Sequence, residues 1–423
     1  MLKGLINTFF VLGLLVITAI GGGYYWYFKR DDDNLLLKDF EPKSNLVTQR
    51  SEISGAKFPV FDAHIHLEYS GMTADEVVAA MDKANVYKVV TLETHGLYGE
   101  KLRANIERYQ QKYPDRFITV ANLDFSGIDQ PDYPERVVQR LQEANDMGAR
   151  GLKIWRDLGL QVRDTKGKLV RLDDPRFDGV WRLAAELKMP VIMHNADPTA
   201  FWKPVDGHNE RYEELQARLS ERLDFPWGKY GPMFEALTGR FFKASLMRHP
   251  KRLFYHTEFT WDNSHFPAKD EILAMRGNIM RRFPETIFIG AHMGYSADNL
   301  DFVASELEKY PNYFVEFSHV VPELGRQPYS TRKFMIEYQD RVLFGLDGKT
   351  EGDAYEASFR FLETKDEYFD YPRAHWDRFG RWRIHGIGLP DSVLRKIYSE
   401  NAEKVFAYQI EDEAIDFSEE TRE

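Results

Sequence analysis

The sequence predicts an α/β protein, a TIM (β/α)8 barrel with an N-terminal transmembrane segment and one long insertion after its fifth strand. Short apolar runs alternate with longer stretches whose apolar residues are three and four positions apart, as strands alternate with amphipathic helices. Eight such runs occur, the number of strands in this barrel. Several end in histidine or aspartate, which are costly to bury unless the strand end faces a site.

The composition is that of a folded, acidic protein without cysteine. The chain has 423 residues, of which 43% are hydrophobic and 14% aromatic, enough for a large core. The formal net charge is −11 and no long basic run occurs, which argues against nucleic-acid binding. Without cysteine there is no disulfide and no thiolate, so any metal site must use histidine and carboxylate ligands.

The first element in chain order is an apolar segment within residues 1–30. It runs from Gly4 to Phe28 and ends in aromatic residues before Lys29 and Arg30. About 20 apolar residues suffice to cross a bilayer, and aromatic residues beside basic ones are typical of a membrane interface. We predict an uncleaved membrane anchor with the globular part outside the cytoplasm, periplasmic in a bacterium. A cleaved signal sequence and a secreted protein are the alternative.

The rest of the chain divides into a polar linker at 31–57, a barrel domain at 58–410 and an acidic tail at 411–423. The predicted strands are the runs 60–67, 87–94, 116–125, 150–155, 189–195, 286–294, 312–318 and 341–348. Helical patterns lie between them, among others at 74–84, 100–113, 134–148 and 298–310. A doubly wound open sheet shows the same alternation, but no glycine-rich phosphate loop follows the first run.

Polar residues stand at the ends of four predicted strands. His64 and His66 close the first run, and their i, i+2 spacing points both rings to the same side of a strand. His194, His292 and Asp347 each follow an apolar run directly. These ends meet in a closed barrel, where imidazoles and a carboxylate around an open position suit a catalytic divalent ion such as zinc.

These segments resemble the amidohydrolase superfamily, in particular the amidohydrolase-related branch of metal-dependent hydrolases that includes aminocarboxymuconate-semialdehyde decarboxylase. The resemblance covers roughly residues 58–408, through FDAHIHL, GLKIW, PVIMH, FIGAHMG, FGLDG and YSENAEKVF. It implies one divalent ion, most simply Zn²⁺ with Mn²⁺ as an alternative, and an acid/base residue beside it. The implied ligands are His64, His66, His194 and Asp347, and the implied acid/base residue is His292, or alternatively Asp347.

Three further polar residues are predicted to bind the substrate: Lys153, Arg156 and Glu316. For Lys153 the resemblance offers an alternative, because other branches of the superfamily place there a carboxylated lysine that bridges two metal ions. Arg156 is alternatively a solvated rim residue, and Glu316 alternatively orients a ligand or forms a rim ion pair. Glu68 and His95 are predicted to line the same pocket.

The connection after the fifth predicted strand, at about 196–267, is far longer than such loops usually are. It is rich in aromatic residues, which predicts a lid over an aromatic or cyclic substrate; a surface subdomain or a homodimer contact is the alternative. A second loop after Asp347 carries four arginines that are predicted to attract an anionic substrate: Arg373, Arg378, Arg381 and Arg383.

The predicted function is metal-dependent hydrolysis of a small molecule, in which metal-activated water attacks the carbonyl of a lactone, ester or amide. Non-oxidative decarboxylation of an aromatic or unsaturated carboxylic acid is the alternative within the same fold, and needs a cationic clamp such as Lys153 or Arg156. A non-catalytic, membrane-tethered binding protein is a further alternative, although binding alone has no chemical need for all the polar strand ends.

Overall fold

The computed structural model describes residues 16, 18, 43–94, 96–204, 206–215, 267–348, 353–371 and 382–406. The chain forms two compact units, residues 1–48 and 49–423, and the second contains the barrel. Some predicted features lie outside the described residues: the anchor apart from Val16 and Thr18, His95, most of the insertion, Arg373, Arg378, Arg381 and the acidic tail. Among the helices that are described, none has the length and apolar character needed to cross a membrane.

Nine short parallel strands in the described residues supply the eight positions of the barrel. They are β1 (Val60–Ile65), β2 (Val86–Thr91), β3 (Phe117–Thr119), β4 (Ala121–Asn122), β5 (Leu152–Ile154), β6 (Val191–Met193), β7 (Phe288–Gly290), β8 (Tyr313–Glu316) and β9 (Val342–Leu343). They form one sheet of β1 to β3 and one of β4 to β9, in chain order. The third predicted run supplies both β3 and β4 because the chain changes partner there. Val120 N donates to Thr91 O, whereas Ala121 N donates to Gly151 O.

The segment after β9 closes the ring onto β1. Ala63 N donates to Phe344 O at 2.9 Å, and Asp347 N donates to His64 O at 2.8 Å. The predicted TIM (β/α)8 barrel is therefore confirmed for the described residues. The same closure places Asp347 beside His64, although the two residues are 283 positions apart in the sequence.

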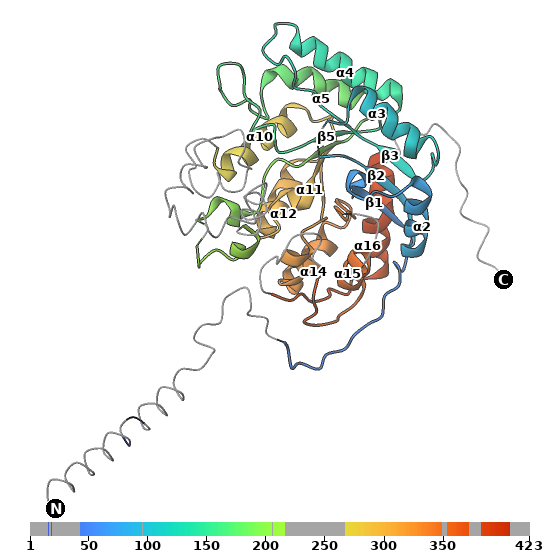
Figure 1. Ribbon diagram of the computed structural model, residues 1–423, viewed down its shortest axis with the longest axis vertical. Coiled ribbons are helices and arrows are strands. Elements are labelled where there is room, and N and C mark those ends of the chain that lie inside the picture. The colour runs from blue at the N-terminus through green and yellow to red at the C-terminus, as the bar shows by residue number, and fades with distance from the viewer. Residues whose placement is uncertain are drawn as a thin grey trace, which may run out of the picture. The chain divides into compact units, whose positions relative to one another are not determined.

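Helices connect the strands and surround them (Figure 1). The longer ones are α2 (Ala74–Ala84), α3 (Gly99–Asn105) with the π-helical turn η4 (Ile106–Gln110), α4 (Tyr133–Met147), α5 (Asp178–Glu186), α10 (Lys269–Arg282), α12 (Leu300–Lys309), α14 (Pro328–Glu337) and α15 (Asp353–Glu363). Shorter ones are α13 (Val321–Gly325), α16 (Asp391–Arg395), η8 (Lys396–Glu400) and α17 (Asn401–Phe406). The short segment α11 (Ala291–Gly294) has a left-handed backbone at His292 and Met293. A capping box of Thr73 and Glu76 begins α2, and Gly148, with φ +115°, ends α4.

Alternate side chains of the strands fill the barrel interior. One apolar cluster combines residues of the strands with residues of α17: Phe61, Val90, Val120, Ile192, Ile289, Phe314, Leu343, Ala402, Val405 and Phe406. Lys153 pairs in register with Ile192, whereas its neighbours Leu152 and Ile154 belong to the cluster outside the barrel. Since successive side chains of a strand point to opposite faces, Lys153 points into the barrel.

Candidate metal centre

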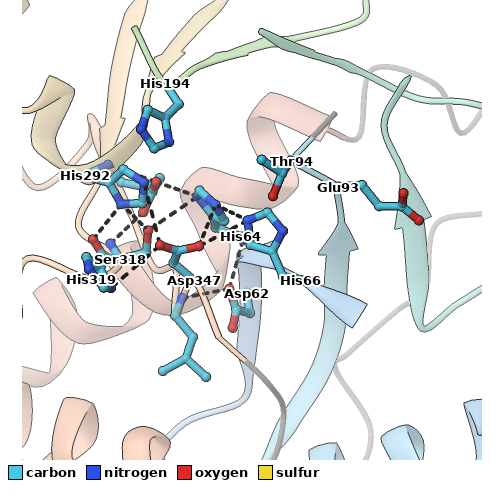
Figure 2. Close-up of polar contacts among 12 residues, drawn as sticks. Asp62, His64, His66, Glu93, Thr94, His194, His292, Ser318, His319 and Asp347 are labelled. Carbon is cyan, nitrogen blue, oxygen red and sulfur yellow. Dashed lines mark hydrogen bonds and ion pairs between the residues drawn. The ribbon is translucent and has the colours of Figure 1, made fainter. Parts of the chain in front are cut away.

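Three side chains converge where β1 ends and the chain leaves β9 (Figure 2). His64 Nε2 lies 3.3 Å from His66 Nε2, and Asp347 Oδ1 lies 3.2 Å from the former and 3.1 Å from the latter. The His64 side chain is fully buried, whereas those of His66 and Asp347 are 11% and 20% exposed. The three ligand atoms are close enough to one another to hold a single metal ion.

Two carboxylates orient the histidines. Nδ1 of His64 donates to Oε1 of Glu316 at 2.8 Å, and Nδ1 of His66 donates to Oε1 of Glu68 at 2.8 Å. With Nδ1 of each ring engaged in this way, Nε2 of each ring faces the oxygen of Asp347. Three such atoms at close range need a positive charge among them, which either a proton on an imidazole or a metal ion can supply. The residues therefore fit a divalent ion that takes nitrogen and oxygen ligands.

The pKa values of His66 and Glu316 show that the surrounding charges favour a positive charge at this site. Burial by itself lowers the pKa of His66, but Asp347 and Glu68 outweigh burial and raise that pKa to about 9. Burial by itself raises the pKa of Glu316, but His64, together with His292 and Ser318, lowers that pKa to about 2. Glu316 therefore remains ionised, and the site carries negative charge that a cation can neutralise.

His292 presents one ring nitrogen to this centre. Its Nδ1 lies 2.9 Å from both the carbonyl oxygen and Oγ of Ser318. Because a carbonyl oxygen only accepts, Nδ1 carries the hydrogen and Nε2 is the unprotonated nitrogen. Nε2 is buried, has no hydrogen-bond partner among the described residues and lies 3.8 Å from Asp347 Oδ2. Burial lowers the pKa of His292 to about 3, which keeps Nε2 a neutral acceptor.

His194, the predicted fourth ligand, lies outside the group of three. Its ring packs against His292 with centroids 5.0 Å apart, and its Nε2 lies 2.6 Å from the hydroxyl of Tyr295. Figure 2 shows its ring set apart from His66 and Asp347. The structure places His194 next to the acid/base candidate, and its role as a metal ligand stays a prediction.

The two predicted cationic substrate contacts have different surroundings. Lys153 is 1% exposed, and its Nζ has no hydrogen-bond partner among the described residues. Arg156 forms an ion pair with Asp197 and lies over the ring of Trp155. The charge of Arg156 is therefore already balanced, whereas that of Lys153 has no direct partner in this part of the chain.

Glu316 lies where it supports the histidines. It is fully buried, and its oxygens accept from His64 Nδ1, from the backbone N of His292 at 3.0 Å and from the backbone N of Ser318 at 2.6 Å. A buried carboxylate with three donors offers no surface to a substrate. These contacts match the alternative in which Glu316 orients a ligand, here His64; the predicted role in substrate binding stays a prediction.

Three residues near the centre were not predicted from the sequence: Tyr295, Ser318 and His319. Tyr295 contacts His194, and Ser318 contacts His292. His319 Nδ1 lies 3.7 Å from Asp347 Oδ2, and its φ is +61°, an uncommon value for a residue with a side chain. The sequence feature that could have identified these three residues is their position at or just after predicted strands that end in functional candidates.

Substitution of Lys153 by methionine is expected to raise the free energy of unfolding of the chelator-treated protein at pH 7 by up to about 3 kcal/mol. Burial lowers the pKa of Lys153 from 10.5 to about 8, against the opposing attraction of Asp347, Glu316 and Glu68. Between these two pKa values the unfolded chain binds a proton that the folded chain does not. The stability of the wild type therefore rises with pH in that window, and the advantage of methionine shrinks.

Urea denaturation at pH 7, 8, 9 and 10 measures this difference. Lys166→Met, at an exposed lysine, is the control and is expected to show no such pH dependence. A Lys153→Met variant that is less stable than the wild type at every pH would contradict the account.

A protein-family model described as amidohydrolase matches residues 61–407, most of the chain. The chain belongs to the amidohydrolase family. As the sequence predicted, it is therefore an enzyme of a metal-dependent class. No curated protein matches this amidohydrolase.

Solved structures similar to this amidohydrolase include three decarboxylases. One is a dihydroxybenzoic acid decarboxylase from Polaromonas sp. JS666 with bound manganese, at 15% identity over 84% of this chain and 98% of that chain, with a TM-score of 0.48. Another is a 2,6-dihydroxybenzoate decarboxylase from Rhizobium, at 15% identity over 83% and 99%, with a TM-score of 0.46. The third is a 5-carboxyvanillate decarboxylase from Novosphingobium aromaticivorans, complexed with manganese, at 15% identity over 85% and 100%, with a TM-score of 0.44.

Proposed function

We propose that this amidohydrolase hydrolyses a lactone, ester or amide at the centre formed by His64, His66 and Asp347. The observation that carries the proposal is Nε2 of His292, a buried neutral acceptor without a partner among the described residues, beside three converging ligand atoms. Hydrolysis needs both elements, a site for a Lewis acid and a group that takes a proton from water.

Each residue has a defined part in this proposal. His64, His66 and Asp347 hold the ion, with His194 as the proposed fourth ligand. A divalent ion bound there supplies Lewis acidity and lowers the pKa of water to about 7. Nε2 of His292 accepts a proton from water and returns it to the leaving oxygen or nitrogen. The hydrogen bond to Ser318 fixes the tautomer in which Nε2 is the acceptor, which supports this role.

Lys153 favours a second candidate function, the decarboxylation of an aromatic or unsaturated acid. Its buried Nζ points into the barrel without a hydrogen-bond partner in the described part, as a clamp for a substrate carboxylate requires. Arg156, the other predicted clamp, is paired with Asp197. Of the two predicted clamp residues, only Lys153 has a side chain without a hydrogen-bond partner in the described part. Hydrolysis therefore remains the first proposal.

We further propose one Zn²⁺ per chain, with Mn²⁺ as the alternative, because the donor set of imidazoles and one carboxylate suits a borderline ion. Carboxylation of Lys153 would instead supply a bridge between two ions.

For the apolar segment at 1–30 we retain the proposal of a membrane anchor with the barrel outside the cytoplasm, or secretion after its cleavage. A homodimer contact or a lid is proposed for the insertion.

A substrate panel assayed with the full-length protein tests the proposed function. Lactones, esters and amides are incubated with zinc-loaded and with chelator-treated protein, and products are separated by chromatography; aromatic acids are assayed in parallel for release of CO₂. We expect hydrolysis that chelation abolishes and zinc restores. Release of CO₂ alone would favour the second candidate, and no turnover of any compound by metal-loaded protein would contradict both.

A further inference from the structure

A left-handed turn carries residues of the centre directly after β7. His292, Met293, Gly294 and Tyr295 have φ values of +57°, +57°, +58° and +57°. Side chains disfavour this conformation, and three of the four residues have one. A conformation of this kind persists only where surrounding contacts enforce it, and such places cluster at functional sites.

A buried arginine from α10 holds the turn in place. Arg276, 1% exposed, donates from Nη1 to the carbonyl oxygen of Gly294 at 2.9 Å and is ion-paired with Glu306 of α12. A Cβ on Gly294 would lie 2.6 Å from Nη1 of Arg276, so only glycine leaves room for this contact. The ion pair between two helices therefore supports the strained backbone on which His292 and Tyr295 stand.

The turn directs the side chain of Tyr295 to the two histidines. Its ring centroid lies 4.6 Å from that of His194 and 4.8 Å from that of His292. Tyr295 is 7% exposed, and among the described residues its hydroxyl bonds only to the ring of His194, at 2.6 Å from Nε2 and 3.2 Å from Nδ1. The hydroxyl thus lies at the ring nitrogen with which His194 would bind an ion, and it donates to that nitrogen whenever the nitrogen is unprotonated.

We propose that Tyr295 is a catalytic residue, whose hydroxyl donates a hydrogen bond to the substrate oxygen that becomes negatively charged when its carbonyl is attacked. The inference rests on the proposed function. Once Nε2 of His194 serves as a ligand, the buried hydroxyl of Tyr295 loses its nearest acceptor, and a buried donor needs another. The oxygen of a substrate placed at the centre is that acceptor, and donors aimed at developing charge stabilise the transition state.

The role of the Tyr295 hydroxyl is tested in the full-length protein loaded with Co²⁺, because the visible absorption of Co²⁺ reports on the ligands of the ion. Inorganic phosphate serves as a tetrahedral, negatively charged probe of the substrate position. Tyr295→Phe is expected to bind Co²⁺ with unchanged stoichiometry and affinity but phosphate about 10- to 100-fold more weakly, the effect of losing one hydrogen bond to a charged group. The matched control is Tyr313→Phe. Its hydroxyl is also buried and has no hydrogen-bond partner among the described residues, and phosphate affinity is expected to stay unchanged.

The outcomes separate this inference from the proposed function. Equal phosphate affinity in Tyr295→Phe and the wild type, with Co²⁺ bound to both, would overturn the role of Tyr295 and leave the metal centre standing. Loss of Co²⁺ affinity in Tyr295→Phe would also overturn it, because the tyrosine would then act on the metal site itself. A wild type that binds no Co²⁺ would overturn the proposed function, and the inference with it.

Discussion

Asparagine in place of Asp347 is expected to lower activity by at least about 10³-fold and to remove most of the bound metal. Asp347 supplies the one carboxylate oxygen of the three converging ligand atoms, within 3.2 Å of Nε2 of both His64 and His66. The backbone of Asp347 has φ +57°, and asparagine tolerates this conformation better than most residues. The substitution therefore removes charge and little else, and several kcal/mol of metal-derived stabilisation corresponds to this factor.

Elemental analysis of the purified variant and its turnover of the panel substrate measure both effects. Asp301→Asn, at an exposed position of α12, serves as the control and is expected to behave as the wild type. Full metal content together with activity within tenfold of the wild type would show that Asp347 is not a ligand.

Replacement of His292 by asparagine is expected to lower kcat by about 10²- to 10⁴-fold while the metal is retained. The amide nitrogen of asparagine can still donate to the carbonyl of Ser318, and asparagine accepts the φ of +57° at this position. What the variant lacks is Nε2, the proton acceptor of the proposed reaction. Because the ligand atoms of His64, His66 and Asp347 are untouched, the loss of activity is expected in the chemical step.

The measurement is kcat together with metal content, and then the recovery of activity when imidazole is added to the variant. Partial recovery by imidazole is expected, because the missing group is an imidazole base. An unchanged kcat would exclude His292 as the acid/base residue, whereas loss of the metal would make it a ligand.

The barrel was predictable because its strands are buried on both faces and read as short apolar runs. The split between β3 and β4 was not, since it depends on which neighbour each residue meets once the barrel closes. Val120 bonds to β2 while Ala121 bonds to the residue before β5, and nothing local to these two residues distinguishes them. The membrane anchor and the lid fall mostly on residues outside the described part, and both stay predictions.

Site residues could be predicted where a polar side chain stands at the end of an apolar strand, as for His64, His66, His292 and Asp347. For Glu316 the sequence left orientation of a ligand as one of several roles, because its partner His64 lies 252 residues away in the sequence. The ion pair between Arg156 and Asp197 likewise depends on a contact between different strand ends. The left-handed turn that presents Tyr295 depends on Arg276, a residue of α10.

The most direct test of the central claim is the metal content of the purified full-length protein, prepared without chelator. The account predicts about one zinc or manganese ion per chain, removed by chelation and restored by dialysis against the metal. Protein that contains no divalent metal and takes up none on dialysis would contradict it.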